Sequence, residues 1–209
     1  MVHPVIKALV TGGHNGIGAA IKQSLMERAN FDIVYSFDLE SGNDVRNYDQ
    51  FSRHMAAIGN IDLLVCCAGI CIYKPFDEMG PDEFARTVDV NLLGVMNCCH
   101  AALPYLKGGD IINIASRAGA YGHAGLSAYC ASKAGVMAFS EALALDYRKH
   151  GVRVGYIMPG TVATGIGGVH PIEDWQIQPE DIGRAVVNMF NMPRRTSLGR
   201  VELKPSFPQ

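Results

Sequence analysis

Strand-like and helix-like segments alternate along almost the whole chain of 209 residues. Short apolar runs rich in branched side chains predict buried strands, and apolar residues three or four apart predict helices. The expected strands are Val5–Val10, Phe31–Phe37, Ile61–Cys66, Asp110–Ala115, Val152–Met158 and Arg200–Leu203. The expected helices are Ile17–Arg28, Tyr48–Ile58, Pro81–Leu106, Ser127–His150 and Pro179–Phe190.

This alternation allows few folds. Strand–helix–strand units make right-handed crossovers, so the strands should form one parallel sheet with helices on both faces. We therefore predict an α/β protein with a doubly wound parallel sheet of the Rossmann type, in a single domain over residues 1–209. Such sheets bind ligands at the carboxyl ends of their strands, so the loops there should carry the chemistry.

Composition narrows the classes of partner. Apolar residues make up 48% of the chain and charged residues 18%, which is typical of a well-packed globular protein. The net charge of −2 gives no electrostatic reason to expect nucleic acid or a membrane as a partner. The longest nearly apolar run, from Leu63 to Tyr73, is too short to span a bilayer, and no signal-peptide pattern is visible. We therefore expect a cytoplasmic location.

Histidine and cysteine spacing does not predict a metal site. The seven histidines lack metal-ligand spacing, and the six cysteines form no C-x-x-C pair. Most of the cysteines lie inside apolar runs, where a free thiol behaves as a small apolar side chain.

A glycine-rich turn, from Thr11 through Gly12, Asn15, Gly16 and Ile17 to Gly18, joins the first expected strand to the first expected helix. Glycines allow a sharp turn and the close approach of a pyrophosphate, and the helix N-terminus supplies N–H groups and a positive dipole end. The Gly-Lys-Ser/Thr ending of a P-loop is absent, which argues against ATP or GTP. Taken alone, such a turn is also compatible with a tight connection that binds nothing.

Asp38 lies 20 residues beyond Gly18, at the end of the second expected strand. A carboxylate there can accept both ribose hydroxyls of NAD and would repel the 2′-phosphate of NADP. No Arg or Lys occurs in the glycine turn or next to Asp38 to offset that charge. We therefore predict NAD, with an NADP enzyme of the same fold, or an Asp that only caps a turn, as alternatives.

Three further residues point to proton transfer. Tyr129 and Lys133 are four apart on one helix face, and an ammonium beside a phenol favours the phenolate, lowering its pKa from about 10. Tyr129 is therefore expected to act as a general acid or base. Ser116, 13 residues earlier, follows an expected strand, where its hydroxyl can hold a substrate oxygen. By itself, the Tyr-x-x-x-Lys pair is also compatible with a solvated helix surface.

Together these motifs resemble the short-chain dehydrogenase/reductase family in its compact single-domain form, from about residue 5 to residue 203. The motifs that carry the resemblance are Thr11-Gly12 with Gly16 and Gly18, Asp44-Val45, Cys66-Cys67-Ala68-Gly69, Asn91 in Val90–Gly94, Ser116, Tyr129, Lys133, Pro159-Gly160 and Thr164.

The resemblance implies hydride transfer between NAD(H) and an alcohol or carbonyl substrate. It implies that Tyr129 exchanges the proton with the substrate oxygen, which Ser116 positions. It also implies that Lys133 lowers the tyrosine pKa and binds the nicotinamide ribose, and that Asn91 holds a relay water. The implied cofactor-binding residues are Thr11, Gly12, Asn15, Gly16, Ile17, Gly18, Asp38, Asp44, Val45, Ala68, Gly69, Tyr129, Lys133, Pro159, Gly160 and Thr164.

The sequence departs from the family pattern in three places. Cys66-Cys67 stands where the family usually has two asparagines, a change we interpret as structural. Only five residues separate Asp38 from Asp44, so the region around the family's third strand should be shortened, with that strand reduced to a stub. Thr164 lies only 15 residues before Pro179, which predicts a short, mobile, glycine-rich flap in place of a longer substrate lid.

Arg117, Tyr121 and His123 lie between Ser116 and the helix of Tyr129. Pointing inward, they could bind a polar or anionic substrate, but we favour a solvated loop. A homodimer or homotetramer is expected, because the two long helices carry apolar surface beside their main stripes. The alternative function is a non-catalytic NAD(H)-binding sensor or interaction protein on the same fold.

Overall fold

The computed structural model describes residues 5–168 and 172–206. In this part of the chain, six strands form one parallel sheet in the order β2-β1-β3-β4-β5-β6. The strands are β1 (Lys7–Thr11), β2 (Ile33–Phe37), β3 (Leu63–Cys66), β4 (Asp110–Ile114), β5 (Arg153–Pro159) and β6 (Arg200–Leu203). The predicted parallel sheet is confirmed, with each strand within two residues of its expected bounds.

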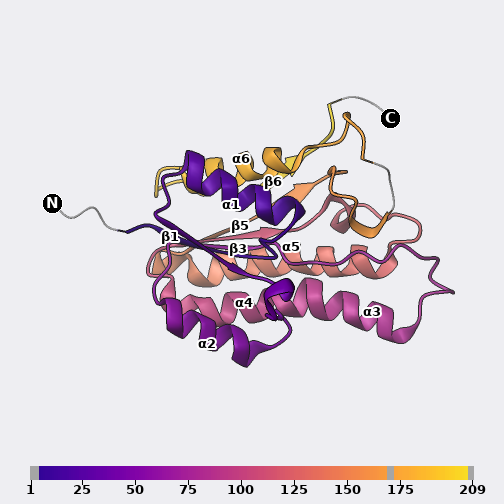
Figure 1. Cartoon of the computed structure of the whole chain (residues 1–209), viewed down its shortest axis with the longest axis horizontal. Helices are drawn as coiled ribbons and strands as arrows, with labels where there is room; N and C mark the ends of the chain where they lie inside the picture. The colour runs from indigo at the N-terminus through magenta and orange to yellow at the C-terminus, as the bar shows by residue number, and fades with distance from the viewer. Residues whose placement is uncertain (1–4, 169–171, 207–209) are drawn as a thin grey trace.

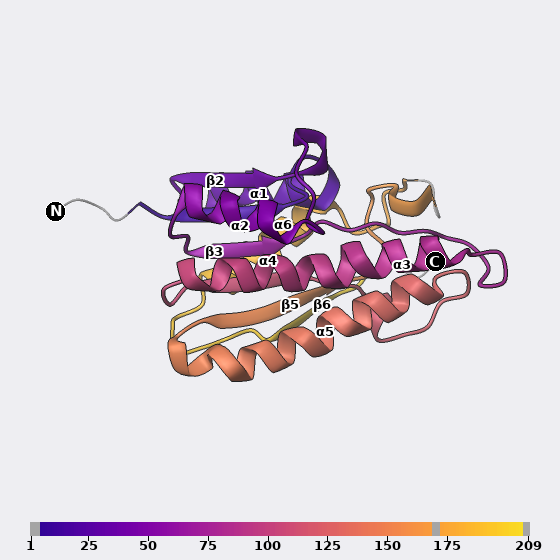
Figure 2. The same cartoon turned by 90° about the horizontal axis from the view of Figure 1, so that it is seen from below.

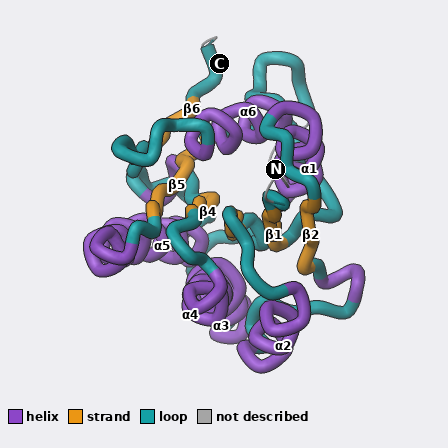
Figure 3. Tube along the Cα trace, turned by 90° about the vertical axis from the view of Figure 1, so that its left-hand side faces the viewer, coloured by secondary structure: helices purple, strands orange, loops and turns teal. Residues whose placement is uncertain are grey.

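Helices cover both faces of the sheet, as predicted (Figures 1 and 3). Helices α1 (Gly16–Arg28) and α6 (Pro179–Phe190) lie together on one face. Helices α2 (Tyr48–Ile58), α4 (Gly94–Ala102) and α5 (Ser127–Tyr147) lie across the other face (Figure 2). Each interface between helices and sheet holds a buried apolar cluster, so the sheet has a core on both sides.

One long helical stretch replaces the single regular helix expected from Pro81 to Leu106. It begins as α3 (Pro81–Val88), with Pro81 at its first position and the Glu83 carboxylate accepting the Gly80 N–H at 2.8 Å. It then widens into a π-helical turn, Asp89–Leu93, before continuing as α4. Such turns often mark functional positions, and this one contains the buried Asn91.

The sheet ends early beside β2. Between β2 and α2 the chain forms one short 3-10 turn, Leu39–Ser41, followed by Gly42 in the left-handed conformation. The predicted shortening is confirmed, but residues 39–47, all of which are described, form no strand at all. The expected stub is therefore absent, and β2 is the edge strand of the sheet.

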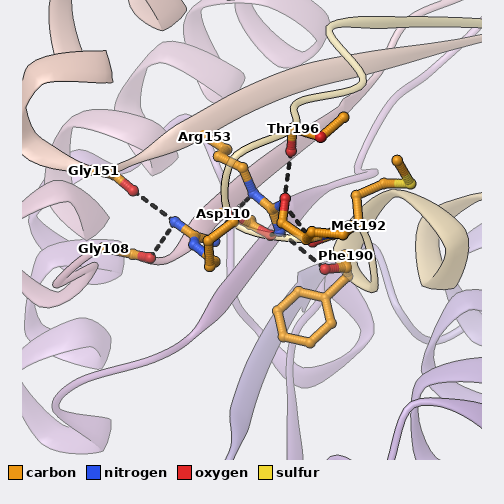
Figure 4. A network of polar contacts seen from close by, with 9 residues as sticks. Gly108, Asp110, Gly151, Arg153, Phe190, Met192 and Thr196 are labelled. Atoms are coloured by element: carbon orange, nitrogen blue, oxygen red, sulfur yellow. Dashed lines mark hydrogen bonds and ion pairs between the residues drawn. The ribbon is translucent and has the colours of Figure 1, made fainter.

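An ion-pair network around Asp110 and Arg153 lies at the amino ends of the strands, opposite the ligand-binding edge. Figure 4 shows its polar contacts from close by. Asp110 and Arg153 are directly paired neighbours at the starts of β4 and β5, and their side chains form two hydrogen bonds of 2.5 and 2.8 Å. Arg153 also donates to the carbonyl oxygens of Phe190 and Met192 beyond the sheet. Arg194 donates at 2.6 Å to the same Asp110 oxygen that accepts from the Nε of Arg153. One carboxylate thus joins two strands to the segment after α6.

Candidate active site

A cleft of about 630 Å³ lies at the carboxyl ends of the strands. Most of the residues proposed from the sequence line it. These are Gly12, Asn15, Gly16, Ile17, Gly18, Asp44, Val45, Ala68, Gly69, Ser116, Tyr129, Lys133, Pro159, Gly160 and Thr164. Three others, Thr11, Asp38 and Asn91, are buried behind the wall. Tertiary folding therefore divides the predicted set into residues facing the cleft and residues supporting it.

The glycine turn has the geometry of a dinucleotide cradle. A side chain on Gly12, whose φ is +67°, would come within 2.8 Å of the Ala68 main chain, and one on Gly18 would clash with the carbonyl oxygen of Gly12. The first turn of α1 has no side-chain cap, because the Asn15 amide donates instead to Glu40 at 3.3 Å. Unpaired N–H groups and a positive helix end therefore face the cleft, which suits a pyrophosphate.

Thr11 supports this turn from below. Its hydroxyl oxygen accepts the N–H groups of Cys67 and Ala68, each at 3.1 Å, and the residue is 1% exposed. The predicted cofactor contact is therefore replaced by a link between the glycine turn and the loop after β3. This link explains how the cradle is held against the neighbouring strand.

Asp38 differs most from its expected orientation. One carboxylate oxygen accepts the His14 N–H at 3.0 Å, and the other accepts the Ser36 hydroxyl at 2.5 Å. The residue is 5% exposed and lies outside the cleft wall. Alternation along β2 places Ser36 on the same side as Asp38, and the glycine turn brings in the His14 amide. The carboxylate therefore holds the cradle from behind rather than facing the cleft.

The outer end of the cleft contains charges that tertiary folding brings together. Asp44 and Val45 line it as predicted. The Arg46 guanidinium donates hydrogen bonds to both carboxylate oxygens of Asp44, which lowers the pKa of that carboxyl. Glu40 and Arg86 also line this end. The two arginines were missed from the sequence because neither adjoins the glycine turn or Asp38 in the chain.

Ser116, Tyr129 and Lys133 meet at the inner end of the cleft. Ser116 begins the turn after β4, where its oxygen accepts the Ala118 N–H at 3.1 Å, and its hydroxyl is near enough to the Tyr129 phenol to favour the phenolate. The Lys133 ammonium lies 5.8 Å from the centre of the Tyr129 ring and donates to the Ile114 carbonyl at 2.8 Å. The helix sets the spacing of Tyr129 and Lys133, and the sheet brings Ser116 to them.

The charges of this trio differ from the expectation. Burial raises the pKa of Tyr129 to about 12, and the nearby Ser116 hydroxyl only partly opposes that rise. Burial also lowers the pKa of Lys133 to about 8. The pKa of Tyr129 is therefore raised, not lowered as expected, because removal of the phenol from water disfavours the phenolate. Tyr129 is a protonated phenol at neutral pH.

Asn91 connects the π-helical turn to the loop after β3. Its amide oxygen accepts the Ile70 N–H at 2.8 Å, and its amide nitrogen donates to the Ile70 carbonyl at 2.9 Å and to Ser132 at 3.1 Å. Ser132 in turn donates to the Tyr129 carbonyl at 2.8 Å. The buried amide thus fixes the loop that borders the cleft and the helix that carries Tyr129.

The segment after β5 forms a wall of the cleft. Thr164 lies over the glycine turn, 3.3 Å from the position of a Cβ on Gly16. Gly167 is in a 3-10 turn and packs against Cys71. A Cβ placed on Gly167 would lie 3.0 Å from the Cys71 sulfur. Residues 169–171 of the predicted flap lie outside the described residues. The part that is described spans from the glycine turn to the loop after β3.

Thiols near Tyr129 are a feature that sequence reasoning did not assign to the site. Cys67 and Cys71 line the cleft, and Cys130 follows Tyr129 on α5. Burial raises the pKa of Cys67 to about 12 and raises that of Cys71, so both remain neutral thiols at neutral pH. Cys67 directly follows β3, and Cys71 lies in the loop after it. Because ligands bind at the carboxyl ends of such strands, these positions could have placed both thiols near the ligand-binding edge.

All six cysteines are free. Within residues 5–168 and 172–206, no three His, Cys, Asp or Glu side chains come together as metal ligands would. In the same part of the chain, every helix is too short or too polar to cross a bilayer.

Known proteins share this sequence pattern. A profile of the family described as "short chain dehydrogenase" matches residues 29–171, a span that includes Ser116, Tyr129 and Lys133. An acetoacetyl-CoA reductase from Shinella zoogloeoides is 35% identical over 178 residues, covering 75% of this chain and 74% of that protein. The glycine betaine reductase ATRR of Emericella nidulans is 28% identical over 95% of this chain, which spans only 18% of that protein's length.

The fold has a solved counterpart in an alcohol dehydrogenase from the archaeon Thermococcus sibiricus, a structure complexed with 5-hydroxy-NADP. The two superpose with a TM-score of 0.83 and 23% sequence identity, covering 98% of each chain. At this identity the likeness concerns the fold alone.

Proposed function

This chain belongs to the short-chain dehydrogenase family, and on that premise we propose that it transfers hydride between NAD(H) and an alcohol or carbonyl substrate. The observation that carries the proposal is that Ser116, Tyr129 and Lys133 meet on the wall of one cleft that begins at a glycine cradle, with the Lys133 ammonium 5.8 Å from the centre of the Tyr129 ring. A Tyr–Lys pair on a solvated helix surface would not line such a cleft, so this position argues against that alternative.

Tyr129 is the proposed proton donor in the direction of reduction. Its phenol carries a proton at neutral pH, which is the form that can protonate a carbonyl oxygen as that oxygen gains charge. Ser116 lines the cleft with Tyr129, so its hydroxyl can hold the same substrate oxygen in place. A nicotinamide dinucleotide, when bound, supplies or accepts the hydride.

Lys133 and Asn91 are proposed to support Tyr129 in different ways. Lys133 is 4% exposed with a pKa of about 8, so it is largely protonated at neutral pH and can stabilise negative charge on the phenol oxygen. Asn91 is proposed to position the loop through Ile70 and to contribute to the relay of the proton to solvent. The main-chain groups of Gly69 and Gly160 remain the proposed partners of the nicotinamide side of the cofactor.

We expect NAD to bind at least about 10-fold more tightly than NADP, a difference of roughly 1.4 kcal/mol. The reason is negative charge: Glu40 lines the cleft beside Asn15, and Asp38 lies directly behind the cradle. Calorimetric titration with each cofactor measures the ratio. Glu40→Gln should reduce it. Tighter binding of NADP would contradict this choice and would indicate that Arg46 and Arg86 bind the 2′-phosphate.

A panel of alcohols with NAD, and of aldehydes and ketones with NADH, tests the function itself by the change in NADH absorbance. Turnover of any member supports an oxidoreductase. Cofactor binding without turnover across the panel would favour the non-catalytic sensor. The protonated phenol and its serine partner argue for the enzyme, because a sensor needs neither.

We also propose that residues 1–209 act as one domain, in the cytoplasm, as a homodimer or homotetramer. The support for self-association is the outer face of α5, where Ala138, Ala142 and Leu145 are exposed, Leu145 by 68%. Light scattering on the purified protein should give at least twice the mass of 22.6 kDa. A strict monomer would contradict this proposal.

A further inference from the structure

Arg117 is held in the cleft wall by three parts of the fold. Its Nε donates to the Glu202 carboxylate of β6 at 2.9 Å. Its guanidinium carbon lies 5.2 Å from the centre of the Tyr121 ring, and its Cδ lies 3.5 Å from the position of a Cβ on Gly160. The predicted solvated loop is therefore wrong for Arg117, because the residue is anchored and lines the same cleft as Ser116.

Most of the donors of this guanidinium are unused by the protein. Arginine has five N–H groups in a planar fork, and only the one on Nε has an acceptor among the described residues. The side chain is 33% exposed and lines the cleft, which leaves it accessible to a ligand. The ion pair with Glu202 and the contact with Tyr121 restrict the fork before any ligand arrives.

The charges around Arg117 favour an anion. At this end of the cleft, the described wall residues include Arg117, His123 and Lys133 but no Asp or Glu. Glu202 does not line the cleft, and it is shared with Lys204 at 3.4 Å. The carboxylates of the wall, Glu40 and Asp44, belong to the opposite, outer end.

Resting on the proposed function, we infer that Arg117 binds a carboxylate group of the substrate, so that the substrate class is oxo acids and the corresponding hydroxy acids. The planar fork matches the two oxygens of a carboxylate, which a single ammonium does not. Arg117 lines the same cleft as Ser116 and Tyr129, so an acid held by the fork can present a nearby carbonyl to them. The overall reaction is oxo acid + NADH + H⁺ → hydroxy acid + NAD⁺.

The test uses NADH and compares 2-oxo and 3-oxo acids of three to five carbon atoms with their methyl esters. The esters keep the reacting carbonyl and lose the negative charge. We expect KM to be at least about 10-fold lower for the best acid than for its ester. In Arg117→Gln, KM for the acid should rise about 10- to 100-fold, while KM for the ester changes little.

Glu202→Gln is the matched variant, because it breaks the same ion pair and leaves the arginine charge in place. It should raise KM for the acid by only about 3-fold, and Arg117→Lys should lie between the two, since it keeps a charge and loses the fork. If Arg117→Gln and Glu202→Gln raise KM equally for acids and for esters, Arg117 only joins β6 to the cleft wall, and the inference is overturned.

The remaining outcomes separate this inference from the proposed function. Turnover of esters and acids with equal KM overturns the carboxylate site and leaves the oxidoreductase intact. Turnover of neither leaves the oxidoreductase to be decided by the wider panel of alcohols, aldehydes and ketones, and calorimetric titration with 3-hydroxybutyrate then tests Arg117 by itself. Binding that is lost in Arg117→Gln and retained in Glu202→Gln supports the site, and equal heats from all three proteins overturn it.

Discussion

Tyr129→Phe should lower kcat/KM by about 10²- to 10⁴-fold and change the dissociation constant of the cofactor far less. The substitution removes one oxygen, the atom that carries the transferable proton. The cradle at Gly12 and Gly18 is formed by main-chain atoms and does not include Tyr129. The substitution should therefore leave it unchanged. Steady-state kinetics and calorimetric titration with NAD measure the two quantities.

Tyr147→Phe is the matched control, because Tyr147 ends the same helix and lies outside the cleft wall. It loses a phenol oxygen in the same way and should keep its activity. If Tyr129→Phe also keeps its activity, the assignment of the proton donor is wrong. The thermal midpoints of both variants should be close to that of the unaltered chain, which excludes unfolding as the cause of any loss.

Asp110→Asn should destabilise the fold by about 3–5 kcal/mol and lower Tm by roughly 6–20 °C. The Asp110 side chain is 4% exposed and forms ion pairs with the guanidinium groups of Arg153 and Arg194. Asparagine keeps the shape and removes the charge, which leaves the 11%-exposed Arg153 side chain without its counter-ion. Thermal unfolding followed by circular dichroism measures the change.

Arg194→Gln separates the buried pair from the exposed one. The Arg194 side chain is 50% exposed, so its ion pair is screened by solvent, and its loss should cost about 1 kcal/mol. Because the network lies at the amino ends of the strands, both variants should keep kcat/KM at temperatures below their Tm. An Asp110→Asn protein with an unchanged Tm would show that the network adds nothing to stability.

Local patterns in the sequence were sufficient for the fold. The strands are short apolar runs and the helices carry apolar residues three or four apart, so the parallel sheet follows from their order. The shortened edge was also visible, because five residues between Asp38 and Asp44 cannot hold a helix and a strand. The π-helical turn around Asn91 was not predicted, since its apolar spacing resembles that of a regular helix.

For the site, the sequence determined which residues reach the ligand-binding edge, because the positions directly after strands and along one helix face are local properties. What each side chain does there was decided by tertiary contacts. Asp38 turns to His14 and Ser36, and burial reverses the expected pKa shift of Tyr129. Arg117 meets Glu202 from a strand 85 residues away. Hydrogen-bond partners and burial depend on such distant segments, whose approach no local pattern encodes.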